Sequence, residues 1–135
     1  MEQTVFNLLT GLNSLGDQFN IQPELLPDSD VLNAGLPCVP FAQGGKQLGS
    51  QHPLSKLAAD LLRIIAVKRY KVVVMEQSPQ ILNVENGMNF DEILNGLHNL
   101  EYMTTYKLFN MWQYNSPMNR TRLYLVAIHI PSFEP

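Results

Sequence analysis

The sequence predicts an α/β fold with a mostly parallel sheet that ends in an antiparallel pair of strands. Three observations carry this prediction. A strong helical period that begins at Pro53 leads directly into the continuous β-branched run KVVVME at residues 71–76. A second helical stripe follows, and two alternating segments at residues 102–112 and 121–130 come after it. The order strand, helix, strand, helix, strand, strand is typical of βαβ units with right-handed crossovers.

Length and composition limit the classes of protein that fit. The 135 residues are enough for one domain with its own core. The net charge of −3 argues against a free-standing module that holds nucleic acid mainly through phosphate contacts. A single cysteine excludes an internal disulfide and zinc sites built on cysteine pairs, and the three histidines lack metal-ligand spacing. With no signal-peptide pattern or membrane-spanning run, we expect a soluble, intracellular protein.

The first part of the chain contains one predicted strand between irregular segments. Residues 2–14 have the spacing of a short amphipathic helix, which Gly11 weakens. After a proline-rich loop at residues 23–28, the segment SDVLNAG at residues 29–35 is typical of a short buried strand. A long loop rich in glycine and proline then extends to His52, and loops of this length are usually functional.

Two helices flank the predicted central strand. Pro53 suits the first position of one helix, and the basic residues near its end complement the helix dipole. Residues 71–76 are predicted to form a central parallel strand that is buried on both faces. We expect the second helix over about residues 89–100, with Asn89 as its N-cap.

Candidate functional residues fall at the carboxyl ends of the strands, where ligands bind in such sheets. Cys38 follows the first strand and Glu76 ends the second, so we expect the two residues to meet at one edge. A lone cysteine is most often a small buried residue, and a carboxylate at a strand end commonly caps a turn. The functional interpretation is an activated thiol beside a partly desolvated acid that donates a proton.

Two arginines lie at the start of the last strand. Arg120 and Arg122 are two residues apart, so their side chains are expected on one face. They form either an ordinary solvated edge or a pair that binds phosphate or the polar edge of a ring.

Taken together, these segments resemble the DNA cytosine-5 methyltransferase family over about residues 15–130. The segment GLPCVPFAQGGKQLG is similar to the family's Pro-Cys loop, and YKVVVMEQS to its apolar strand that ends in Glu-Asn-Val. The segment PMNRTRLYLVAI resembles its Gln-X-Arg-X-Arg segment, and LGDQFNIQPELLPDSDVLNAG its Gly-Asp segment. The order of the four segments is more specific than any one of them.

The resemblance implies a partial Rossmann-like methyltransferase fold and methyl transfer from S-adenosylmethionine to carbon 5 of a flipped-out cytosine in DNA. Cys38 would be the nucleophile that adds to carbon 6 of the base. Glu76 would supply a hydrogen bond or proton at ring nitrogen 3. Arg122 would hold the base edge or the region of the thiol, and Arg120 a neighbouring phosphate or the loop.

For the cofactor, the resemblance implies that Asp17 contacts the adenine amino group and that Pro37 helps to form the floor of the pocket. The family's glycine-rich cofactor loop and its target-recognition region have no counterpart in the sequence. We therefore expect one truncated catalytic domain, residues 1–135, that acts on DNA with a partner chain or a missing domain, as a hetero- or homo-oligomer without a membrane. The alternatives are a degenerate methyltransferase remnant and a non-catalytic α/β interaction protein.

The remaining aromatic residues and histidines are expected to have ordinary packing roles. Trp112, Tyr106 and Phe109 are interpreted as strand packing rather than as base-stacking platforms. His98 is expected at the surface of the second helix, and His129 is expected to pack at a strand end.

Overall fold

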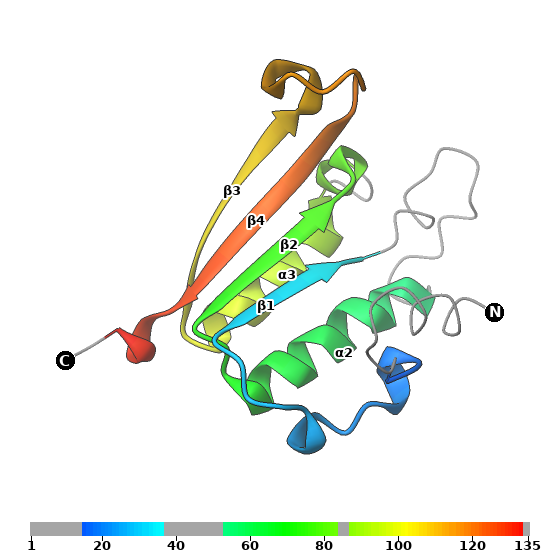
Figure 1. Ribbon diagram of the computed structural model, residues 1–135. Helices are drawn as coiled ribbons and strands as arrows, with labels where there is room; N and C mark the ends of the chain where they lie inside the picture. The colour runs from blue at the N-terminus through cyan, green and yellow to red at the C-terminus, as the bar shows by residue number, and fades with distance from the viewer. Residues whose placement is uncertain (1–14, 37–52, 84–86, 134–135) are drawn as a thin grey trace.

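A four-stranded sheet organises the part of the chain that the structure, a computed structural model, describes: residues 15–36, 53–83 and 87–133 (Figure 1). The strands are ordered β1-β2-β4-β3 across the sheet, and two helices, α2 and α3, pack on it. The bounds of these elements are β1 Val31–Gly35, α2 Pro53–Lys68, β2 Val72–Gln77, α3 Met88–Asn99, β3 Tyr102–Asn110 and β4 Thr121–His129. The predicted order of strands and helices is confirmed.

The sheet is mixed, and its directions follow from the connections. β1 and β2 are parallel and are joined through α2, whereas β4 runs antiparallel to both of its neighbours, β2 and β3. Three strands therefore point in one direction, and β4 alone points in the other. The predicted antiparallel pair at the end of the chain is the pair of β3 and β4.

Both helices cover the same face of the sheet (Figure 1). Each presents one apolar stripe to the strands, as the helical spacing predicts. The core that results buries residues from both helices and from every strand except β1, whose Leu32 and Ala34 pack against its margin. At Gly96 of α3, an added Cβ would collide with the Leu62 side chain of α2, so the two helices approach closely there.

The opposite face of the sheet corrects one prediction. β2 was expected to be buried on both faces, but its burial alternates, with Val73 and Met75 buried and Val72 and Val74 only half-buried. No helix of the described residues lies over this second face (Figure 1). A continuous β-branched run is typical of a strand covered on both sides, and the second cover is not formed by the described residues. We call this side the uncovered face.

Element boundaries differ from the prediction where turn geometry decides them. Helix α3 begins at Met88, after Gly87 in a left-handed conformation (φ 81°), so Asn89 lies inside the helix rather than at its N-cap. β3 ends at Asn110, and Met111–Tyr114 forms a 3-10 turn. α2 begins at Pro53 as predicted. The segments predicted at residues 2–14 and in most of the long loop lie outside the described residues.

A buried tyrosine links three strands at the edge of the sheet where β2 and β3 begin and β4 ends. The Tyr102 hydroxyl donates to the Tyr70 carbonyl oxygen at 2.6 Å, and the Tyr102 ring contacts His129 with 4.9 Å between ring centroids. His129 is itself buried and lies 2.7 Å from the Ser132 hydroxyl, which confirms its packing role at a strand end. Burial raises the pKa of Tyr102 to about 12. None of the described helices combines the length and apolar character needed to cross a membrane.

The raised pKa of Tyr102 predicts a loss of stability in alkali. Below pH 10 the hydroxyl is protonated in both folded and unfolded chains; between pH 10 and about 12 only the unfolded chain ionises, so the free energy of unfolding falls. The Tyr102→Phe variant lacks this ionisation but also lacks the buried hydrogen bond, which costs about 1 kcal/mol at neutral pH. Urea unfolding from about pH 8 to about pH 11 should therefore show wild type and variant converging as the pH rises. A constant difference would contradict the assignment.

Candidate active site

Glu76 lies at the carboxyl end of β2 and projects onto the uncovered face. Its neighbours Met75 and Gln77 are buried on the helix-covered face, so strand alternation turns the Glu76 carboxylate the other way. The register pairs Glu76 with Gly35 of β1 on one side and with Tyr124 of β4 on the other. An added Cβ at Gly35 would lie 3.9 Å from Glu76 Oε2, so the end of β1 passes directly beside the carboxylate.

Both predicted arginines reach this carboxylate. Arg122 Nε lies 2.8 Å from Glu76 Oε1, and Arg120 Nη2 lies 3.9 Å from the same oxygen. Arg122 also donates from Nη1 to the Thr121 carbonyl oxygen at 2.8 Å, which fixes the guanidinium. The Glu76 side chain is 37% exposed and the Arg122 side chain 22%. The acid predicted from the sequence is therefore a partly buried carboxylate paired with two cations.

These side chains line a hollow of about 390 Å³ at the carboxyl edge of β1 and β2. Its lining residues are Gly35, Leu36, Glu76, Gln77, Ser78, Arg120 and Arg122. The predicted nucleophile Cys38 and the predicted cofactor residue Pro37 lie outside the described residues. Leu36 is the last described residue before them, and it lines the hollow.

Gln77 is a site residue that sequence reasoning did not single out. It is only 3% exposed, and its Nε2 donates to the Leu36 carbonyl oxygen at 3.4 Å, which links the end of β2 to the end of β1. Its Oε1 is buried and has no hydrogen-bond partner among the described residues. The sequence held no clear signal for it, because the run VVVME before Gln77 does not alternate and so does not show which side chains are buried.

Asp17, the other predicted cofactor residue, does not line the hollow. It caps the 3-10 turn η1, Gln18–Asn20, and its carboxylate accepts a hydrogen bond from the Phe19 backbone at 3.1 Å. Gln18 donates from its side chain to the Leu57 carbonyl oxygen in α2, so this segment packs near the start of that helix. The Asp17 side chain is exposed.

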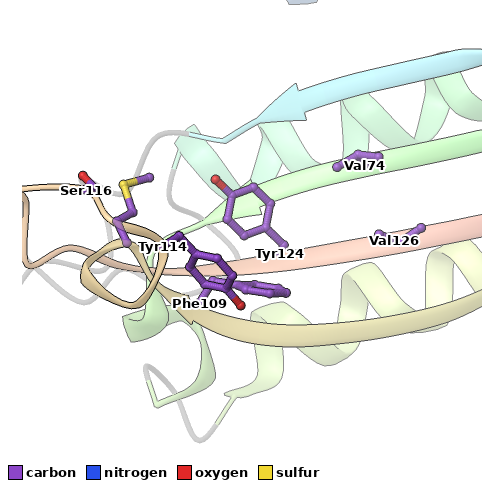
Figure 2. Close-up of a pocket in the computed structure, with 7 residues that line it drawn as sticks. Val74, Phe109, Tyr114, Ser116, Tyr124 and Val126 are labelled. Atoms are coloured by element: carbon purple, nitrogen blue, oxygen red, sulfur yellow. The ribbon is translucent and has the colours of Figure 1, made fainter.

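A second hollow, of about 480 Å³, lies next to the first on the uncovered face. Figure 2 shows the rings of Phe109, Tyr114 and Tyr124 gathered around it, with Val74 and Val126 on the strands behind. Met111 and Ser116 complete the lining. The Phe109 ring makes an edge contact with Tyr124 at 5.7 Å between centroids, so its predicted packing role is confirmed.

Other expectations have mixed outcomes. Tyr106 packs edge-on against Phe90 at 4.9 Å between centroids, and His98 lies at the surface beside the Thr104 hydroxyl, as predicted. Trp112 was expected to pack in a strand, and this was wrong: it lies in the turn after β3 and is 67% exposed. The described part of the chain contains no group of three or more His, Cys, Asp and Glu side chains that could hold a metal ion.

Comparison with known sequences bears on what this geometry does. The family model described as C-5 cytosine-specific DNA methylase matches residues 3–132. The type II methyltransferase M.HhaI of Haemophilus parahaemolyticus is 32% identical over 93% of this chain, and M.BsuFI of Bacillus subtilis is 35% identical over 84%. The chain spans 38% of the length of the first relative and 28% of the second.

Solved structures show the same fold. The methyltransferase EhMeth of Entamoeba histolytica matches with a TM-score of 0.75 and 18% identity, over 98% of this chain and 43% of its own. The Dnmt2 methyltransferase of S. pombe matches with a TM-score of 0.73 and 20% identity, over 98% of this chain and 41% of its own. The partial Rossmann-like arrangement expected from the sequence is thus present in larger methyltransferase chains.

Replacing Arg122 tests whether the ion pair is needed for folding. Because both partners are partly exposed, we expect Arg122→Gln to lower the free energy of unfolding by less than about 1 kcal/mol. The matched control is Lys71→Gln, which removes an exposed pair between Lys71 Nζ and Asp30 Oδ1 at 2.9 Å. Urea unfolding of both variants gives the comparison. A loss of several kcal/mol for Arg122→Gln alone would show that the pair holds the sheet together.

Proposed function

Because the chain belongs to the C-5 cytosine-specific DNA methylase family, we propose that it forms the catalytic part of a methyltransferase that acts on carbon 5 of cytosine in DNA. One observation carries the proposal. The Glu76–Arg122 pair lies at the carboxyl end of β2, beside the end of β1 from which the chain continues to Cys38. The reaction requires an acid, cations and a thiol close together, and the described residues supply the acid and the two cations.

The chemistry assigns each group a task. Carbon 5 of cytosine is a weak nucleophile, so the Cys38 thiolate first forms a bond to carbon 6 and displaces ring electrons toward nitrogen 3. Glu76 holds a proton at nitrogen 3, which makes carbon 5 resemble an enamine. After carbon 5 has gained its new substituent, it loses its proton to water. The electrons of that C–H bond re-form the double bond between carbons 5 and 6 as the carbon–sulfur bond breaks, the proton at nitrogen 3 returns to Glu76, and the thiolate is restored. The base must leave the helical stack for Cys38 to reach it.

The arginines position the acid and the substrate. Arg122 bonds to Glu76 at 2.8 Å and is itself held by the Thr121 carbonyl, so it fixes the direction of the carboxylate. Arg120 is farther from Glu76, at 3.9 Å, and its side chain is 46% exposed, which suits contact with a phosphate beside the target base. Arg122 is therefore assigned to orient Glu76, and Arg120 to bind the DNA backbone.

The described residues also fit part of a site for S-adenosylmethionine. Asp17 offers an exposed carboxylate, and a carboxylate is the right acceptor for the adenine amino group. When bound, the cofactor supplies the methyl group as an electrophile. Asp17 would orient the adenine, and Pro37 would form the floor of the pocket.

Further polypeptide is needed to pack on the uncovered face and to supply functions that the described residues lack. The half-buried side chains Val72, Val74, Val126 and Ile128 form an apolar surface there, and α/β sheets normally carry cover on both faces. The chain spans less than half of each relative and solved structure compared above. We assign the cofactor loop, the reading of DNA sequence and the cover of this face to a partner chain or a further domain.

A hydrogen-exchange experiment on the substrate tests the roles of Cys38 and Glu76 without the cofactor. Addition of Cys38 to carbon 6 lets carbon 5 take a proton from water, so DNA that carries tritium at carbon 5 of cytosine should release tritium into solvent. We expect Cys38→Ser to abolish this release. Glu76→Gln should slow it by about 10²- to 10⁴-fold, the usual contribution of a general acid.

The matched control is Glu24→Gln, a charge change at an exposed glutamate in the 3-10 turn Pro23–Leu25. Its rate of release should equal that of wild type. Release that persists in Cys38→Ser, or that is absent from the folded wild-type chain, would contradict the proposed chemistry.

A further inference from the structure

The β3–β4 hairpin extends beyond the carboxyl end of β2 (Figure 1). β2 ends where Gln77 pairs with Leu123, whereas β3 and β4 remain paired as far as Asn110 and Thr121. Residues 111–120, which we call the hairpin tip, connect the two strands. The hairpin tip therefore lies just past the Glu76–Arg122 pair, at the same edge of the sheet as the hollow around Glu76.

The hairpin tip exposes large apolar side chains. Trp112 is 67% exposed, Tyr114 is 63% exposed and Met118 is 53% exposed. A tryptophan left in solvent forgoes the burial that makes this residue favourable in a fold. Three such side chains within seven residues form a surface suited to binding rather than a packing element.

The hairpin tip is also held in a defined conformation. Asn110 accepts a hydrogen bond from the Trp112 backbone N–H at 2.9 Å and donates from its side chain to Asn119 and Thr121. Asn115 adopts a left-handed conformation (φ 59°) that closes the turn. Trp112 therefore lies in a turn whose conformation is fixed by hydrogen bonds. A preorganised surface of this kind loses less conformational entropy when it binds.

The charge of this part of the chain differs from that of the rest. Residues 102–133 carry Lys107, Arg120 and Arg122 and no Asp or Glu, so all twelve acidic residues of the chain lie elsewhere. Exposed aromatic rings on an element without acidic residues are typical of surfaces that stack nucleic-acid bases beside a bound backbone.

We propose that the hairpin tip is a DNA contact in which Trp112 stacks on a base next to the target cytosine. The inference rests on the proposed DNA substrate and deepens it by naming a contact on this chain. The hairpin tip borders the hollow around Glu76, because Arg120 is the last residue of the tip and also lines the hollow. Apolar rings fit base faces of any sequence, so the contact steadies the DNA without reading it.

The chain carries its own reporter for this contact, since Trp112 is its only tryptophan. The chain is titrated at low salt with a single-stranded oligonucleotide of mixed sequence and with a duplex that contains one unpaired cytosine. We expect saturable quenching of tryptophan emission, because stacking on a base quenches indole fluorescence. The quenching should weaken as salt is raised, since cations at the site contribute to binding.

Substitution separates stacking from general association. In fluorescence anisotropy with the same labelled oligonucleotides, Trp112→Leu should raise the Kd by about 5- to 100-fold, the range expected for loss of one stacked base. The matched control is Phe133→Leu, an aromatic residue that is 60% exposed beyond the opposite end of β4. Its Kd should equal that of wild type.

The other outcomes overturn the inference. DNA binding with unchanged tryptophan emission, equal Kd values for wild type and Trp112→Leu, or no DNA binding each removes the hairpin tip as a DNA contact. Tritium release from cytosine separates this failure from failure of the proposed function. Release by a chain without quenching leaves the methyltransferase chemistry standing, and quenching by a chain without release leaves the DNA contact standing.

Discussion

The candidate site depends on the register with which β4 enters the sheet between β2 and β3. Leu123, Leu125 and Ala127 are buried against the helices, and strand alternation therefore places Arg122 on the opposite face, beside Glu76. A slip of one residue would expose these apolar side chains and turn the guanidinium into the core, which costs far more than the ion pair gains. The hydrophobic set of one strand thus fixes where a cation of the site lies.

The two faces of the sheet have different tasks. The covered face buries the side chains of α2 and α3 and supplies most of the apolar stabilisation of the fold. The uncovered face carries Glu76, Arg122 and the aromatic hollow around Phe109 and Tyr124. The candidate site therefore lies on the side of the sheet that contributes least to the core.

The α/β class, the element order and the place of Glu76 at a strand end could be predicted from the sequence, because periodicity and the strand-end rule are local signals. The contact of Glu76 with both arginines could not, because it depends on the register between β2 and β4. Predictions were wrong where one sequence pattern is compatible with two structures. A run of three valines is the same whether one face or both are covered. The exposure of Trp112 depends on the turn that Asn110 and Asn115 form, and alternation in a strand does not report a turn. The contact of Gln77 with the Leu36 carbonyl could not be predicted because the two residues lie 41 positions apart along the chain.

The lengths of the connections between strands indicate the order in which parts of the sheet form during folding. β3 and β4 are separated only by residues 111–120, whereas residues 36–71 separate β1 from β2. Hairpins close within microseconds, and longer loops carry a larger entropic cost, so the topology favours early pairing of β3 with β4 and later docking of β1. During synthesis, Glu76 leaves the ribosome before Arg120 and Arg122. In the nascent chain, the Glu76–Arg122 pair can therefore form only after β4 has been synthesised.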